Sequence, residues 1–216
     1  MNETDYIPAL RFAWLNKVYD PVVQLTMPER RFKLDLIEQA DIGSSGHHIL
    51  DFGCGTATLT MLTKAKYPGS FVTGIDVDAS IIQLAHLKLK DFPHPIRLDS
   101  YGGTRLPYLD ETFDRVISCL VFHHLTPSQK TTALRELNRV LKPGGVLCVG
   151  DWGRPRNPLM RGLFYSIQLL DGFGTTRDNV KGRLPAFIRE AGFEDTKILK
   201  NYATIFGTLE LIKAKK

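Results

Sequence analysis

The chain has 216 residues, which is enough for one well-buried α/β domain and short for two. Apolar residues make up 43% of it and charged residues 24%, a composition that excludes a disordered or fibrous protein. The formal net charge is +5. Residues 1–150 carry 16 basic and 16 acidic side chains, whereas residues 151–216 carry 12 and 7, so the basic excess lies in the last third.

The uneven charge leaves two interpretations open. The excess can be a solvated face together with the terminal Lys-Ala-Lys-Lys, or it can meet an anionic substrate or an anionic lipid surface as a peripheral contact. Nucleic acid is not expected as a partner, because the excess is modest and lacks interleaved aromatic residues on a recognisable module. The sequence leaves the oligomeric state open.

The ends and the cysteines indicate a cytoplasmic protein. The N-terminus lacks a basic flank followed by an apolar segment, and no apolar run approaches about 18 residues, so neither export nor a membrane span is expected. The three cysteines lie in or beside apolar stretches, which is typical of buried thiols in a reducing compartment.

In chain order, residues 5–41 are expected to be largely helical, with breaks at Pro21 and Pro28. Helix-length segments then alternate with apolar segments suited to buried parallel strands, which are residues 47–52, 70–76, 95–99, 114–120 and 144–151. This alternation predicts right-handed crossovers and a parallel sheet, whose ligands bind beyond the carboxyl ends of the strands.

Two of these helices have clear sequence patterns. In residues 78–92 one apolar face should pack on the sheet, formed by Ile81, Leu84, Ala85 and Leu89. In residues 125–145, Thr126 is the expected N-cap, Pro127 suits the first helical position and Gln129 completes a capping box. The buried stripe of this second helix should be Leu134, Leu137 and Leu141.

After residue 150 the alternation stops. Arg154, Arg156 and Arg161 begin a segment with apolar residues at helical spacing, namely Leu159, Met160, Leu163, Phe164, Ile167 and Leu170. It can be an apolar pocket with a basic mouth, a surface helix touching anionic lipid, or an ordinary lid packed on the core. A helix near residues 184–192 and two closing strands should follow.

Residues 48–60 join the first strand to a loop with two glycines. Gly53 and Gly55 permit positive φ and close approach of a ligand, and the following helix directs free N–H groups at it. The loop can be a tight turn, a nicotinamide-dinucleotide fingerprint or a loop for another nucleotide-like cofactor. The fingerprint G-x-G-x-x-G fails at Thr58, whereas D-x-G-x-G fits, with Asp51 ahead of the glycines and Ala57 where a third glycine often stands.

With this loop the chain resembles class I S-adenosylmethionine-dependent methyltransferases, in the subgroup that includes quinone-biosynthesis enzymes. "VTGIDVD", "LPYLDETFDRVIS", "FHHLTP" and "LNRVLKPGGVL" extend the resemblance clearly over residues 47–150 and more loosely over 178–214. It implies a Rossmann-like seven-stranded α/β sheet, mostly parallel with a C-terminal antiparallel hairpin, with helices on both faces. It also implies one domain, with a helical cover (1–46), a cofactor-binding core (47–150), a variable acceptor or lid segment (151–177) and a closing helix and strand pair (178–216).

The resemblance implies S-adenosyl-L-methionine as cofactor and S-adenosyl-L-homocysteine as product. Asp76 would hold both ribose hydroxyls, because a carboxylate accepts two hydrogen bonds, and Val77 would lie against the adenine. Asp99 and Ser100 match the positions that accept from the adenine amino group, and the backbone of Cys119 would lie near that group. The loop would contribute Asp51, Gly53, Cys54, Gly55 and Thr56. Alternatively, Asp51 caps a tight turn and Asp76 is a solvated strand end.

Methyl transfer from a sulfonium is an in-line displacement, to which positioning and desolvation contribute most. His123, ahead of His124, is the candidate for substrate contact or base work; otherwise it bonds a carbonyl or caps a helix. Tyr19 can close over the methionine end with its ring towards the sulfonium, or be a buried aromatic residue. Asp151 and Trp152 can contact the substrate. No metal site is expected, because adjacent histidines point apart.

The sequence thus predicts a methyltransferase for a small, apolar or amphipathic acceptor such as a quinone precursor. Alternatives are a phospholipid head-group or natural-product methyltransferase, a cofactor-binding protein of the same fold without catalysis, and a nicotinamide oxidoreductase. The acceptor and the atom that is methylated stay open.

Overall fold

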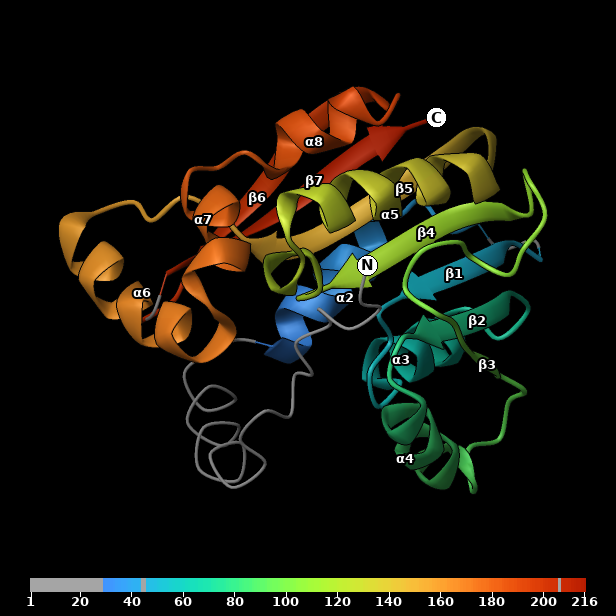
Figure 1. Ribbon diagram of the computed structural model, residues 1–216. Coiled ribbons are helices and arrows are strands. Elements are labelled where there is room, and N and C mark those ends of the chain that lie inside the picture. Colours follow the sequence, from blue (N-terminus) through green and yellow to red (C-terminus); the bar gives the residue numbers. More distant parts are fainter. Residues whose placement is uncertain (1–28, 44–45, 206) are drawn as a thin grey trace.

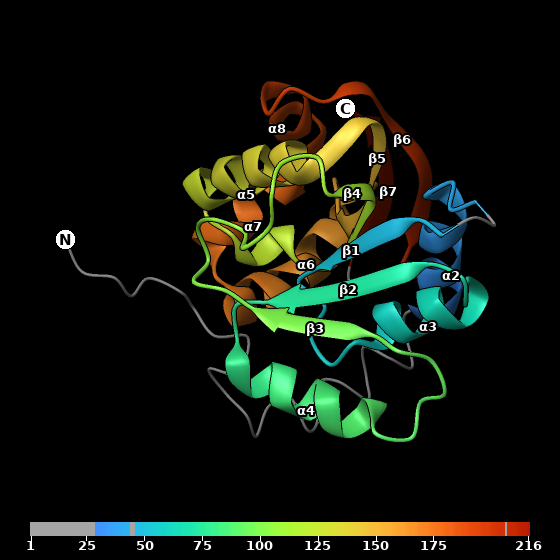
Figure 2. The ribbon, with the colours of Figure 1, turned by 90° about the vertical axis from the view of Figure 1, so that its right-hand side faces the viewer.

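The sheet has seven strands in the order β3-β2-β1-β4-β5-β7-β6 (Figures 1 and 2). This computed structural model describes residues 29–43, 46–205 and 207–216. The strands are β1 His48–Phe52, β2 Phe71–Asp76, β3 Arg97–Ser100, β4 Phe113–Cys119, β5 Leu141–Trp152, β6 Glu194–Ala203 and β7 Thr208–Lys215. Strands β1 to β5 pair in parallel, and β7 is antiparallel to β5 and β6. The predicted, mostly parallel sheet with a C-terminal hairpin is confirmed.

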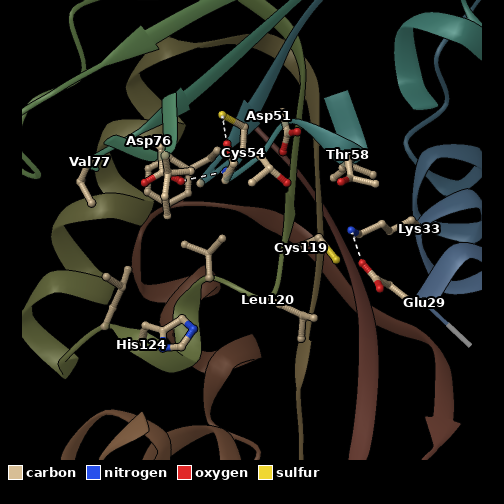
Figure 3. A pocket seen from close by; sticks show the side chains of 18 of the residues that line it. Glu29, Lys33, Asp51, Cys54, Thr58, Asp76, Val77, Cys119, Leu120 and His124 are labelled. Carbon is tan, nitrogen blue, oxygen red and sulfur yellow. Dashed lines mark hydrogen bonds and ion pairs between the residues drawn. The ribbon is translucent and has the colours of Figure 1, made fainter. Parts of the chain in front are cut away.

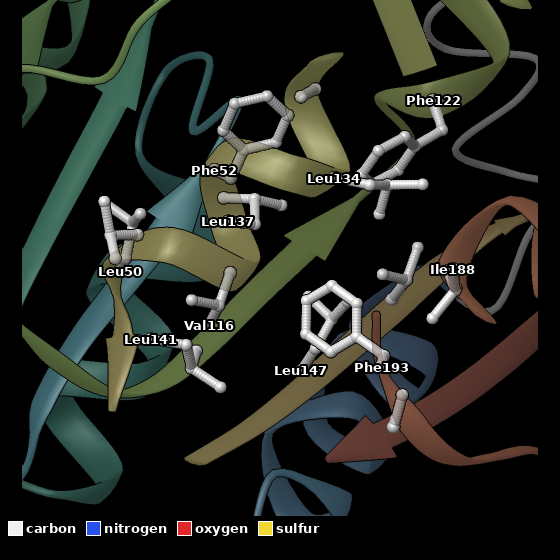
Figure 4. Close-up of a cluster of buried hydrophobic side chains, with 14 of the residues drawn as sticks. Leu50, Phe52, Val116, Phe122, Leu134, Leu137, Leu141, Leu147, Ile188 and Phe193 are labelled. Atoms are coloured by element: carbon white, nitrogen blue, oxygen red, sulfur yellow. The ribbon is translucent and has the colours of Figure 1, made fainter. Parts of the chain in front are cut away.

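Helices cover both faces of the sheet, as Figure 2 shows. They are α2 Glu29–Gln39, α3 Thr58–Lys66, α4 Ala79–Leu89, α5 Pro127–Val140, α6 Pro158–Asp171, α7 Phe173–Val180 and α8 Leu184–Glu190, with the short 3-10 helix η1 at Phe122–His124. One core cluster joins α5 and α8 to the sheet through Leu50, Phe52 and Leu147 (Figure 4). The other joins α2 through Phe32 and Ile49. Strands covered on both faces explain the nearly continuous apolar segments.

The sequence pattern of α5 is confirmed. The Thr126 side chain accepts from the backbone N–H of Gln129, and the Gln129 side chain accepts from the backbone N–H of Thr126. Leu134 and Leu137 are fully buried, and so is Leu141, which already belongs to β5.

The predicted buried face of α4 is partly wrong. Of the four predicted residues, Ala85 is buried and Ile81 and Leu89 are half-buried, but Leu84 is 52% exposed. Ile82, outside the predicted face, is buried, and Leu87 is 71% exposed. Helix α4 packs on β2 and on the edge strand β3, beyond which the sheet ends. Part of its apolar face therefore has no strand beneath it. None of the helices in the described part of the chain is long and apolar enough to cross a membrane.

Gly150 brings α2 close to the sheet, and its substitution provides a test of this packing. A Cβ at Gly150 would lie 2.6 Å from Phe32 Cζ and 2.8 Å from Leu36 Cδ1. We expect Gly150→Ala to lower the free energy of unfolding by about 1–3 kcal/mol through overpacking, measured by urea denaturation. The control Gly174→Ala, where a Cβ would meet nothing within 4 Å, should be neutral or slightly stabilising, because Gly174 lies in α7 and alanine favours a helix. Equal effects of the two variants would contradict this account.

Candidate functional site

A cavity of about 360 Å³ lies beyond the carboxyl ends of β1, β2 and β4 (Figure 3). This volume is within the usual range for a small-molecule pocket. Many of the residues chosen from the sequence line it: Asp51, Gly53, Cys54, Gly55, Thr56, Asp76, Val77 and Cys119. The sheet topology brings them together because parallel strands end at one edge.

The β1–α3 loop is attached to the end of β2. The N–H groups of Gly53 and Cys54 donate to the Ile75 carbonyl at 2.9 and 3.0 Å, and the N–H of Gly55 donates to Asp76 Oδ2 at 2.9 Å. Gly53 has φ +70°, and a Cβ there would lie 2.4 Å from Val121 Cγ2. Gly55 has φ +52°, and a Cβ there would meet no atom within 4 Å. The loop therefore needs glycine at the first position for space and presents open backbone at the second.

Ala57 stands where a third glycine is common in this loop, and it adopts the backbone conformation that glycine favours. It is the N-cap residue of α3 and has φ +60°, a left-handed conformation that costs a non-glycine residue about 1–2 kcal/mol. Its methyl group cannot accept from the first-turn N–H groups of α3. The helix N-terminus therefore faces the cavity without a side-chain cap from this residue.

Asp76 is at the end of β2 and is nearly buried. Its two carboxylate oxygens accept from the N–H groups of Gly55 at 2.9 Å and Asp78 at 3.1 Å. A carboxylate has about four lone-pair sites, so both oxygens can accept further hydrogen bonds from a ligand diol.

Asp51 is a buried carboxyl group at the wall of the cavity. Thr60 Oγ1 donates to Asp51 Oδ2 at 2.6 Å. Burial raises the pKa of Asp51 to about 7, although the Thr60 hydrogen bond and the charge of Lys33 oppose this shift. A ligand cation beside Asp51 would favour its ionised form.

Helix α2 contributes two cavity residues that the sequence analysis missed. Glu29 and Lys33 line the cavity and form an ion pair at 2.5 Å between Oε1 and Nζ. Their spacing of four residues predicts a pair on one helix face. No local signal indicates that this face meets the β1–α3 loop, since α2 reaches it only through tertiary packing.

Asp99 and Ser100 do not line the cavity. Asp99 Oδ2 instead accepts from the Tyr108 hydroxyl at 2.8 Å and pairs with Arg97 Nε at 2.8 Å. The next residue, Tyr101, lines the cavity in their place.

The two adjacent histidines face different surroundings. His124 lines the cavity, across from Asp76 and Cys54 in Figure 3. His123 is buried and does not line it. His123 Nδ1 lies 2.7 Å from Asp151 Oδ1, and Asp151 Oδ2 accepts from the Phe122 N–H at 2.7 Å. The two imidazole centroids are 3.9 Å apart.

The pKa shifts of Asp151 and His124 indicate the charge state of each group. Burial alone would raise the pKa of Asp151, but the charge and hydrogen bond of His123 hold it below its ordinary value. Asp151 is therefore a carboxylate, and His123 Nδ1 donates to it. Burial and the neighbouring His123 lower the pKa of His124 to about 3, so His124 is neutral near pH 7.

The remaining candidates from the sequence are Cys119, Trp152 and Tyr19. Cys119 is at the cavity, but burial raises the pKa of its thiol to about 12, which does not favour a nucleophile. Trp152 is buried against Phe164, with ring centroids 5.4 Å apart. Tyr19 lies outside the described residues, as do the side chains of Ile167 and Leu170.

Comparisons with known proteins agree with the fold. Residues 49–145 match the family model of the methyltransferase domain. The described structure is similar to a putative methyltransferase of Bacillus halodurans, with a TM-score of 0.67, 20% identity and coverage of 85% of this chain and 98% of that one. It is also similar to phosphoethanolamine N-methyltransferase 2 of Haemonchus contortus bound to S-adenosylhomocysteine, with a TM-score of 0.70, 14% identity and coverage of 85% and 52%. The protein therefore has the class I methyltransferase fold.

Within this class the sequence resembles the quinone-biosynthesis type, as predicted. The chain is 34% identical to the ubiquinone/menaquinone biosynthesis C-methyltransferase UbiE of Syntrophotalea carbinolica over 148 residues, which are 68% of this chain and 61% of that protein. It is 36% identical to the demethylmenaquinone methyltransferase of Staphylococcus saprophyticus over 118 residues, which are 54% and 49%. The chain thus spans less than two thirds of the length of these relatives.

Proposed function

We propose that this protein is an S-adenosylmethionine-dependent methyltransferase and that its cofactor binds in the cavity beyond β1, β2 and β4. The observation that carries the proposal is the attachment of the open glycine loop to Asp76 at the cavity wall. The match of residues 49–145 to the methyltransferase domain supports the same cofactor.

The residues at the cavity fit the parts of this cofactor. Asp76 has lone pairs left for a ribose diol, and Gly55 leaves open space beside the loop backbone. Asp51 suits the amino group of the methionine end, whereas Lys33 suits its carboxylate. Val77 and Tyr101 offer apolar surface for the adenine. The bound cofactor would supply an electrophilic methyl group on a sulfonium.

The opposite side of the cavity suits the methyl acceptor. Leu120, Val121 and Leu125 make this side apolar, which excludes water and favours an apolar or amphipathic ring. His124 is neutral there, so it can accept a hydrogen bond from an acceptor hydroxyl without repelling the sulfonium. His123 and Asp151 act as positioning residues, because they hold η1 in place.

We infer a small quinone-type precursor as the acceptor, in line with the names of the two curated relatives. Residues 151–177 would form the variable segment near the acceptor, and Tyr19 remains a candidate to cover the methionine end. A head-group amine is the alternative, because the Haemonchus contortus neighbour was solved with phosphomonomethylethanolamine.

Asp76→Ala tests cofactor binding. We expect at least about tenfold weaker binding of S-adenosylhomocysteine by calorimetry, because the ribose diol loses its charged acceptor. The exposed Asp91→Ala is the matched control and should bind as the unmodified protein does. Unchanged affinity of Asp76→Ala would refute the ribose assignment, and binding of NADH but not S-adenosylhomocysteine would refute the proposed function.

Asp51 gives the binding a defined pH dependence. Its pKa of about 7 in the free protein means that the carboxyl group is largely protonated below this pH and ionised above it. A cofactor ammonium favours the ionised form, so affinity for S-adenosylhomocysteine should rise as the pH increases through about 7 and level off above it. Asp51→Asn should bind more weakly and lose this step. A step of equal size in Asp51→Asn would contradict the assignment.

Turnover measurements test whether the two histidines act in the reaction or only in packing. With labelled cofactor and a demethylmenaquinol analogue, we expect His124→Ala to lower kcat about a hundredfold while S-adenosylhomocysteine affinity is retained. His123→Ala should also lose turnover with cofactor binding retained, because Asp151 loses its partner and η1 its position. The exposed His86→Ala is the control. Full activity of both histidine variants would assign the histidines to packing. Turnover only of phosphoethanolamine would overturn the acceptor proposal.

A further inference from the structure

Helix α6 exposes an apolar face with no charged side chain among its described exposed residues. On its inner face Phe164 and Gln168 are buried, and Phe164 packs on Trp152. On its outer face Leu159 is 72% exposed and Leu169 is 73% exposed. Only Arg161 and Asp171 are charged in its 14 residues. The helix is thus held to the protein by one face and presents leucines to the outside. Exposed leucines become evidence for an interaction site only where they form one surface with other apolar or charged groups.

Aromatic residues extend this apolar face at the C-terminal half of α6. Tyr165 is 47% exposed and Phe173, at the start of α7, is 50% exposed, with ring centroids 6.3 Å apart. The Arg161 guanidinium lies 4.1 Å from the Tyr165 ring centroid. Half-exposed tyrosine beside leucine and arginine is the composition that favours a membrane–water interface.

A cluster of cations adjoins the N-terminal end of α6. Arg154, Arg156, Arg161 and Lys181 line a shallow hollow there, and no acidic residue lines it. Arg154, Arg156 and Lys181 are exposed and form no ion pair with any described residue. The nearby Glu210 is buried, and its Oε1 accepts from the backbone N–H of Arg154 at 3.2 Å. Burial raises the pKa of Glu210, whereas the Arg154 hydrogen bond and the charge of Arg156 oppose this shift, so one buried acid faces four cations.

We propose that the outer face of α6 and this cation cluster dock on the surface of an anionic lipid bilayer. The leucines enter the boundary between head groups and acyl chains, and the cations lie over the lipid phosphates. A second copy of the chain fits this surface poorly, because a two-fold contact brings the same patch of both copies together and thus two cation clusters. A bilayer supplies both the apolar layer and the negative charge.

The position of α6 gives the docking a direction. The helix follows β5 at the carboxyl edge of the sheet (Figure 1). The residues at the ends of β1, β2 and β4 on this edge line the cavity. Docking through α6 therefore turns this edge towards the lipid. If the proposed function holds, an apolar acceptor would have a short path from the bilayer to the cavity. The docking itself does not depend on the proposed function.

Co-sedimentation with vesicles tests the proposal on the full chain. Vesicles of phosphatidylcholine with one third phosphatidylglycerol should bind the protein, and vesicles of phosphatidylcholine alone should bind it much more weakly. Each cation contributes about fivefold at an anionic surface, so Arg154→Gln with Arg156→Gln should lower the partition coefficient by roughly tenfold or more. Leu159→Ser with Leu169→Ser should lower it similarly.

The matched control uses α4, where Leu87→Ser with Lys90→Gln also replaces an exposed leucine and an exposed cation. This variant should bind vesicles as the unmodified protein does. The proposal is overturned if the unmodified protein binds neither vesicle, if it binds both equally, or if the control loses as much binding. It is also overturned if sedimentation equilibrium finds a dimer that the α6 leucine variant dissociates. Every variant is also titrated with S-adenosylhomocysteine. Unchanged affinity for this ligand shows that a loss of vesicle binding reflects the docking surface and not the cofactor site.

Discussion

The attachment of the β1–α3 loop to the end of β2 is the constraint on which the rest of the site depends. Three consecutive amide groups, from Gly53 to Gly55, donate to the Ile75 carbonyl and the Asp76 carboxylate. This geometry requires positive φ at both glycines and leaves no room for a side chain at the first. It also sets where α3 begins and therefore where its free N–H groups point.

A second constraint holds the opposite side of the cavity. Asp151 is fully buried at the end of β5, and its carboxylate accepts from the Phe122 N–H and from His123 Nδ1. Removing either partner of a buried charged pair costs more than the pair itself contributes, because the remaining charge is left unpaired. The segment that carries His124 is thereby tied to the strand next to β4, and the two sides of the cavity are positioned by different pairs of strands.

The carboxyl edge of the sheet thus gathers features from distant parts of the sequence. The glycine loop follows β1, the two histidines follow β4 and α6 follows β5. Helix α2, which precedes β1 in the chain, adds Glu29 and Lys33 to the cavity. Helix α6 carries the exposed Leu159 and Leu169 next to the cluster of Arg154, Arg156 and Lys181. The same edge therefore combines a cavity with convergent polar groups and an exposed surface of leucines and arginines.

The mostly parallel sheet, the capping box of α5 and the glycine loop could be predicted from the sequence, because apolar periodicity and the spacing from Asp51 to Gly55 are local properties. Which nearby residues face the cavity depends instead on the tertiary structure. His124 lines it instead of His123, Tyr101 lines it instead of Asp99, and Glu29 and Lys33 join it from α2. Leu84 is exposed because α4 lies at the sheet edge, and Leu159 because α6 is held by Phe164. These outcomes depend on the orientation of each helix and strand. Contacts with residues distant in the sequence set this orientation, so a local sequence pattern does not predict it.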